Sequence, residues 1–127
     1  MKKTPASKQR KQPGPGTGKQ ERYLQPSILL SLRQTPSYGY EIIGALQRFG
    51  FIQGSAPPGM IYRHLRQLEA DGLVTSHWET QGSGPAKRIY DITPEGDEAL
   101  ELWVAHMELL RDKLADFVET FRRSEGG

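Results

Sequence analysis

The strongest constraint on the fold of this chain is an apolar pattern near its C-terminus that repeats every seven residues. The a and d positions of three heptads are all apolar, namely Leu100, Trp103, Met107, Leu110, Leu114, Phe117 and Phe121. This spacing predicts one long helix, capped by Thr93, beginning at Pro94 and ending near Arg123. A strict 3.5-residue repeat favours packing along another helix. We therefore expect these seven residues to form a homodimer interface, with packing inside one chain as the alternative.

Three shorter helices and a hairpin are expected between residues 23 and 93. The predicted helices cover Pro26–Gln34, then Tyr38–Phe49 with Ser37 as its cap, and then Pro58–Asp71. Alternating patterns on both sides of a Gly-rich turn predict a two-stranded hairpin over Leu73–Thr80 and Lys87–Thr93. This order predicts a mainly α protein with a small β-hairpin. The expected architecture is a winged helix-turn-helix, followed by a dimerisation helix at 94–123 and a tail at 124–127.

The net charge of +2 hides a strong asymmetry along the chain. Residues 1–22 carry +6, residues 23–94 carry +1, and residues 95–127 carry −5. The first block contains few apolar residues and several Pro and Gly, so we expect it to be a disordered basic arm. Such an arm either follows the phosphates of a nucleic acid or is a solubilising tail, and both interpretations stay open.

The third predicted helix and the hairpin carry the candidate contacts with double-stranded DNA. Because Ile61, Leu65 and Leu68 form a buried stripe, the arginines of this helix are expected on the opposite face. Arginine offers paired donors to guanine or charge to a phosphate, and the hairpin would lie beside the backbone or minor groove. The alternative is a solvated helix face. The candidate DNA-binding residues are Tyr38, Tyr62, Arg63, Arg66, Ser83, Lys87 and Arg88.

Enzymatic and metal-dependent functions have little support. The chain has no Cys, and His64, His77 and His106 do not have the spacing of metal ligands. No nucleophile motif is present, so we expect neither catalysis nor a cofactor. The sequence also contains no apolar run of membrane-spanning length and no apolar leader, so we expect a cytoplasmic protein without a membrane span.

Trp103 and Met107 lie one turn apart in the heptad pattern. An aromatic ring beside a flexible thioether is suited to an adaptable ligand cavity. These two residues are therefore a candidate effector site, although ordinary interface packing is the alternative.

Several segments together resemble PadR-type transcriptional regulators. Ile28–Leu32 and Ser37–Ile42 resemble the opening of that family, Pro58–Val74 its recognition helix, and Gly84–Gly96 its wing. The single C-terminal helix resembles the short subgroup. Within this subgroup, Glu79–Trp103 and the segment Gln47-Arg48-Phe49-Gly50-Phe51 are similar to repressors that respond to polyhydroxybutyrate.

The resemblance implies a dimeric repressor that binds a palindromic operator. It also implies release of DNA when an effector binds near the dimer interface, either a small apolar or aromatic molecule or polyhydroxybutyrate. Two features depart from this picture, because Asp91 stands where the family often has Arg and residues 23–123 carry a net charge of −3. These features favour the alternative of a protein-interaction or granule-associated module with weakened DNA binding.

Overall fold

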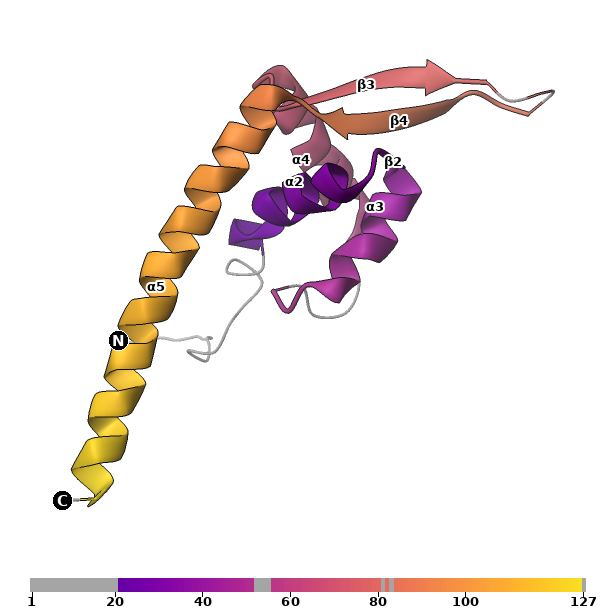
Figure 1. Cartoon of the computed structure of the whole chain (residues 1–127). Coiled ribbons are helices and arrows are strands. Elements are labelled where there is room, and N and C mark those ends of the chain that lie inside the picture. The colour runs from indigo at the N-terminus through magenta and orange to yellow at the C-terminus, as the bar shows by residue number, and fades with distance from the viewer. Residues whose placement is uncertain (1–20, 52–55, 81, 83, 127) are drawn as a thin grey trace, which may run out of the picture.

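The computed structural model describes residues 21–51, 56–80, 82 and 84–126. Four short helical segments and a small sheet form one body, and a long helix extends away from it (Figure 1). The elements are α2 (Leu24–Gln34), β2 (Ser37–Tyr38), α3 (Gly39–Ala45), the 3-10 turn η1 (Leu46–Arg48), α4 (Pro58–Ala70), β3 (Val74–Glu79), β4 (Lys87–Ile92) and α5 (Pro94–Gly126). The expected mainly α fold with a winged helix-turn-helix order is confirmed.

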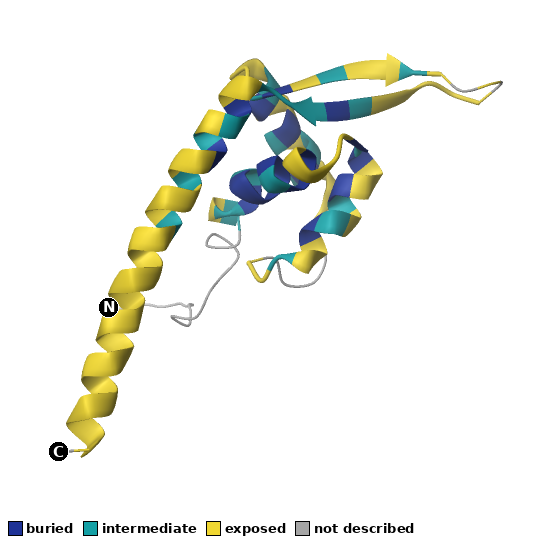
Figure 2. Ribbon diagram, viewed as in Figure 1, coloured by how far each residue is buried: buried dark blue, intermediate teal, exposed yellow. Residues whose placement is uncertain are grey.

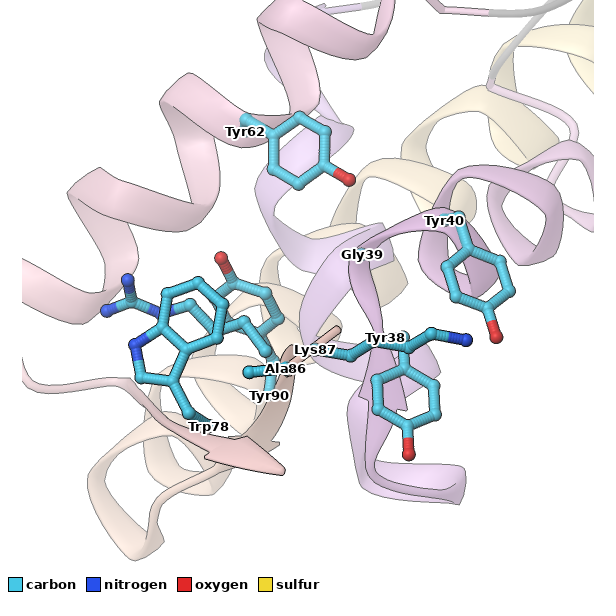
Figure 3. Close-up of a pocket in the computed structure, with 9 residues that line it drawn as sticks. Tyr38, Gly39, Tyr40, Tyr62, Trp78, Ala86, Lys87 and Tyr90 are labelled. Atoms are coloured by element: carbon cyan, nitrogen blue, oxygen red, sulfur yellow. The ribbon is translucent and has the colours of Figure 1, made fainter. Parts of the chain in front are cut away.

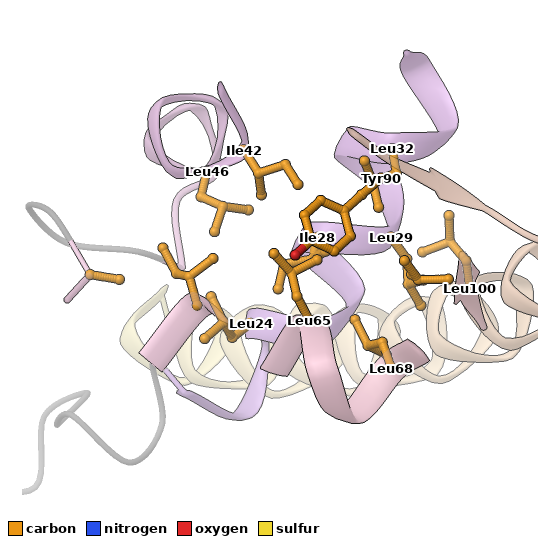
Figure 4. Packing of buried hydrophobic residues seen from close by; sticks show 13 residues of the cluster. Leu24, Ile28, Leu29, Leu32, Ile42, Leu46, Leu65, Leu68, Tyr90 and Leu100 are labelled. Carbon is orange, nitrogen blue, oxygen red and sulfur yellow. The ribbon is translucent and has the colours of Figure 1, made fainter. Parts of the chain in front are cut away.

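The hydrophobic core lies where α2 meets α3, α4 and the base of the hairpin. The buried stripe predicted for α4 is confirmed, since Ile61, Leu65 and Leu68 are all 0% exposed. Tyr90 from β4 and Leu100 from α5 reach into the same cluster (Figure 4). Each buried apolar side chain of this size stabilises the fold by about 1.5–3 kcal/mol relative to its exposed state.

The sheet has three antiparallel strands in the order β2-β4-β3. Ser37 pairs with Tyr90 and Tyr38 pairs with Ile89. The predicted hairpin is confirmed as β3 and β4, but the short strand β2 was not predicted. The helical segment predicted roughly over 38–49 is observed from Gly39 to Arg48, as α3 followed by η1. Ser37 is extended in the sheet and does not cap α3. The helix begins at Gly39 and passes into η1 at Leu46.

The predicted start of α5 is confirmed by the hydrogen bonds of Thr93. Its Oγ1 accepts from the backbone N–H of Gly96 at 3.0 Å and donates to the carbonyl oxygen of Gly72 at 2.7 Å. Gly72 has a φ of 79°, the left-handed conformation that ends a helix and that glycine adopts without strain. The first turn of α5 is thus fastened to the end of α4, which fixes the direction of the long helix.

Beyond its first turns, α5 is exposed in this single chain (Figure 2). Leu110, Leu114, Phe117 and Phe121 are 38%, 58%, 75% and 51% exposed. Large apolar surfaces of this kind on a protein mark interaction sites. None of the described helices combines the length and the apolar character needed to span a bilayer.

Candidate nucleic-acid interface

The outer face of α4 has the composition that the sequence predicted. Arg63, Arg66 and Ala70 are exposed, and Tyr62 is half-buried at the edge of the buried stripe. The helix ends at Ala70 with Asp71 as its C-cap, and β3 begins at Val74. The exposed arginines are thus followed along the chain by the hairpin, whose second strand β4 carries Lys87 and Arg88.

Tyr62 packs closely against the first residue of α3. A Cβ atom on Gly39 would lie 2.5 Å from Cε1 of the Tyr62 ring and 2.6 Å from its hydroxyl oxygen. Only glycine at this position allows the ring to pack there without a shift. The contact sets the separation between the start of α3 and α4 at Tyr62.

A pocket of about 360 Å³ lies between α3, α4 and the hairpin (Figure 3). Four of the predicted DNA-binding residues, Tyr38, Tyr62, Lys87 and Arg88, line it. The other lining residues are Gly39, Tyr40, Trp78, Ala86 and Tyr90. The pocket combines aromatic walls with two cationic side chains, a composition found where proteins bind nucleic acid.

Lys87 is held over two stacked tyrosines on one side of the pocket. Its Nζ lies 5.6 Å from the ring centroid of Tyr40 and 5.8 Å from that of Tyr38. The two rings are nearly parallel, with centroids 5.7 Å apart. The Tyr38 hydroxyl donates to Oε1 of Glu79 at 2.7 Å, and this hydrogen bond to a carboxylate raises the pKa of Tyr38. The Lys87 ammonium group thus lies over two aromatic rings, one of which is hydrogen-bonded to β3 of the hairpin.

Arg88 is positioned by residues from both α4 and β3. Its Nε donates to Oγ of Ser76 at 2.8 Å, and its Nη2 lies 3.4 Å from Oε1 of Glu69. The guanidinium carbon also lies 5.4 Å from the ring centroid of Trp78, within the range of a cation–π contact. The Ser76 hydroxyl also donates to the other Glu69 oxygen at 2.7 Å, so Glu69 of α4, Ser76 of β3 and Arg88 of β4 are joined in one set of contacts.

The remaining predicted DNA-binding residues lie outside the pocket. Arg66 is exposed on α4, next to the lining residue Tyr62 on the same face. Arg63 faces the other flank of the helix, where Nη2 of its guanidinium pairs with the carboxylate of Glu21. Ser83 falls outside the described residues. Glu21 was expected in the disordered arm, but it contacts α4 and so belongs to the folded part.

Sequence reasoning missed the residues that support the cations. Tyr40 and Trp78 are 57% and 62% exposed, and Glu69 and Ser76 brace Arg88. The alternation in β3 places Trp78 on the same face as the buried Val74. A large aromatic side chain such as Trp78 that is exposed at the far end of this strand indicates a functional surface. The pairing of Glu69 with Arg88 depends on the fold and has no local signal.

The predicted dimer and effector residues divide into three groups by their exposure. Leu100 is 5% exposed in the core of its own chain, which leaves little of its surface for a partner. Trp103 and Met107 are half-buried, and the Trp103 ring lies edge-on to Tyr23 with centroids 6.2 Å apart. The last four positions are exposed. The single chain therefore uses the beginning of the heptad pattern internally.

A second pocket, of about 270 Å³, lies between α5, the start of α2 and the loop after η1. Tyr23 and Phe51 form one wall, with stacked rings whose centroids are 4.3 Å apart. Met107 belongs to the opposite wall, and Trp103 is not among the lining residues. The full lining is Tyr23, Phe51, Met107, Leu110, Arg111 and Leu114.

Comparisons with known proteins agree with this architecture. Residues 28–102, more than half of the chain, match the model of the transcriptional regulator PadR-like family. The negative transcriptional regulator PadR of Bacillus subtilis is 27% identical over 95 residues, covering 75% of this chain and 52% of the relative. A "probable transcriptional regulator" of Mycobacterium tuberculosis is 33% identical over 82 residues, covering 65% and 43%. The chain thus spans about half the length of the curated relatives it matches.

The similarity extends to solved structures. A conserved protein described as a potential transcription factor has a TM-score of 0.75 and 34% identity, covering 88% of this chain and 98% of its own. The family and these relatives are transcriptional regulators rather than enzymes, and the winged helix, the buried stripe of α4 and the long α5 all fit that fold. On this evidence the chain belongs to the PadR-like family of transcriptional regulators.

Proposed function

We propose that this chain is a homodimeric repressor that binds a palindromic operator in double-stranded DNA. In this account α4 enters the major groove and the wing lies along the neighbouring backbone. The observation that carries the proposal is that Lys87 and Arg88 line an aromatic pocket together with Tyr62 of α4, and that Arg66 is exposed one helical turn from Tyr62. The B. subtilis relative is named a negative transcriptional regulator, which supports repression rather than activation.

Dimerisation through α5 would set the spacing of the two recognition helices. A winged-helix dimer reads two half-sites about 34 Å apart, one turn of DNA. The exposed Leu110, Leu114, Phe117 and Phe121 supply an apolar seam, and a second copy would cover the same seam by twofold symmetry. Such burial removes from water an apolar surface that the single chain leaves exposed.

An effector is proposed for the pocket beside Met107. Its walls are apolar and aromatic, and Arg111 adds one cation that would pair with a carboxylate. A small aromatic or apolar molecule, or a short polyhydroxybutyrate chain, would fit apolar walls of this kind. Because Leu110 and Leu114 belong to both the pocket and the seam, an effector there would alter the dimer and so the DNA-binding population.

The direct test is a titration of the full-length protein against the duplex upstream of its own gene, with a scrambled duplex as control. We expect selective binding at moderate salt. Equal binding to both duplexes would favour the second candidate, a protein-interaction or granule-associated module. The net charge of −3 over residues 23–123 and the exposed apolar face of α5 are the features that favour that candidate.

A further inference from the structure

The carboxylate of Glu21 connects the start of the described chain to the exposed face of α4. Its Oε2 accepts hydrogen bonds from Nη2 of Arg63 and from Nε2 of His64, the second at 2.9 Å. On the other side of the imidazole ring, Nε2 of Gln25 lies 3.0 Å from Nδ1 of His64. His64 is 16% exposed, Glu21 34% and Arg63 59%, so the contacts run from the protein interior to its surface.

The donors and acceptors in this chain of contacts follow a single direction. An amide nitrogen only donates, so Nδ1 of His64 accepts from Gln25 and the ring proton lies on Nε2. That proton is donated to Glu21, and the hydrogen bond from His64 lowers the pKa of the Glu21 carboxyl. The carboxylate is therefore ionised at neutral pH, and it holds the Arg63 guanidinium by charge and by hydrogen bonding.

We propose that Glu21 is a positioning residue that orients Arg63 for a guanine edge in the major groove. The contact uses Nη2, and no other Arg63 donor has a partner among the described residues, which leaves a second edge of the guanidinium for a base. A guanidinium that is already ordered loses less side-chain entropy when it binds. This role rests on the DNA-binding function proposed above.

Arg66 provides an internal comparison on the same helix. It is also exposed, and among the residues that the structure describes no carboxylate lies within ion-pair distance of it. A carboxylate that acted only by repelling DNA phosphates would weaken both arginine contacts alike. A carboxylate that positions Arg63 would act through that residue alone.

A double-mutant cycle on the full-length chain separates these two effects. The probes are a duplex enriched by the wild-type protein from a random-sequence library and an unrelated duplex of the same length. We expect Glu21→Ala to weaken binding to the enriched duplex roughly fivefold, at the low end of the value of a bidentate base contact. Binding to the unrelated duplex should not weaken. In the Arg63→Ala background, Glu21→Ala should cause no further loss.

Two controls accompany the cycle. Glu21→Ala combined with Arg66→Ala should be additive, because these side chains share no partner. Glu21→Gln retains an oxygen acceptor and should restore part of the selectivity, and circular-dichroism melting shows whether each variant is folded.

Three results would overturn the role of Glu21. One is an equal tightening on both duplexes when Glu21 is replaced, and another is the same loss in the Arg63→Ala background as in the wild type. If the wild-type protein enriches no sequence, the DNA-binding function itself fails, and the role of Glu21 with it.

Discussion

A Cβ atom on Gly96 would lie 2.1 Å from the carbonyl oxygen of Leu73, so the first turn of α5 rests directly on the backbone that follows α4. The same carbonyl accepts the backbone N–H of Thr93 at 3.1 Å. A capping box that begins at Thr93 would place Glu at position 96. The close approach of the Leu73 carbonyl explains why a glycine is found there instead. The direction of α5, and with it any spacing between two recognition helices, depends on this contact.

Gly96→Ala should therefore destabilise the fold by about 1–3 kcal/mol, the usual cost of overpacking. Urea denaturation followed by circular dichroism measures the change. Gly44→Ala is the matched control, because it is also a helical glycine and a Cβ there has no atom within 4 Å. That variant should be neutral or more stable by about 0.5–1 kcal/mol. Equal effects of the two substitutions would contradict the packing argument.

Leu110→Glu combined with Leu114→Glu should convert the proposed dimer into monomers, because charged side chains would be buried in the seam. Sedimentation velocity at micromolar protein measures the outcome. Leu102→Glu with Leu109→Glu is the control, since these leucines are 74% and 62% exposed and lie outside the a and d positions of the seam. A dimer that survives the first pair but not the second would place the interface on the other face.

Arg66→Ala should weaken operator binding by about 1–3 kcal/mol if its guanidinium makes a bidentate base contact. Fluorescence anisotropy with a labelled operator measures the loss. Arg122→Ala is the control for charge, because that residue lies near the far end of α5 and pairs with Glu125. Identical affinities for the wild type and Arg66→Ala would remove Arg66 from the interface.

Deletion of residues 1–20 tests the basic arm. If the arm binds phosphates, the deletion should weaken binding to every duplex. It should also flatten the dependence of log K on log salt by about 0.9 for each lost contact. Affinities measured between 50 and about 200 mM salt give the slope. The deletion stops at residue 20 so that Glu21 keeps its contact with Arg63. An unchanged slope would show that the arm does not bind phosphates and is only a tail.

The ion pair of Glu21 also predicts a pH dependence of stability. The folded-state pKa of Glu21 is below its ordinary value of 4.5, chiefly because His64 donates a hydrogen bond to it. A lowered carboxyl pKa adds stability above the unfolded-state pKa, and this is lost as the pH falls through the folded-state value. Unfolding free energies measured from pH 7 to pH 3 should therefore fall more steeply for the wild type than for Glu21→Gln. Parallel curves would show that the contact does not affect stability.

Periodic features of the chain could be predicted from sequence because they repeat locally. The buried stripe of Ile61, Leu65 and Leu68 follows the helical period, and Thr93 followed by Pro94 is a local signal for the start of α5. The two-residue strand β2 could not be predicted, since Ser37 and Tyr38 are extended only because they pair with β4. Strands this short have no alternation to detect.

The candidate site was predicted in its two cations and in two of its tyrosines, Tyr38 and Tyr62, but not in the residues that support the cations. Lys87 and Arg88 were identified by charge and by their place in the wing, but their partners come from distant segments. Tyr40 and Glu69 meet these cations through the folding of α3 and α4 against the sheet. Glu21 and Arg63 are 42 residues apart in the sequence, so no local pattern predicts their contact. The contact joins α4 to a segment whose composition alone predicts disorder.

Selective DNA binding by α4 and the hairpin is the property on which the proposed function depends. Its most direct measurement is the affinity of the full-length protein for an operator selected from a random-sequence duplex library, compared with an unrelated duplex at about 150 mM salt. We expect at least about a thousandfold preference for the selected operator and a large loss when Arg66 and Lys87 are both replaced by alanine. Equal affinity for the two duplexes, or no change in the double variant, would show that this surface does not bind DNA selectively.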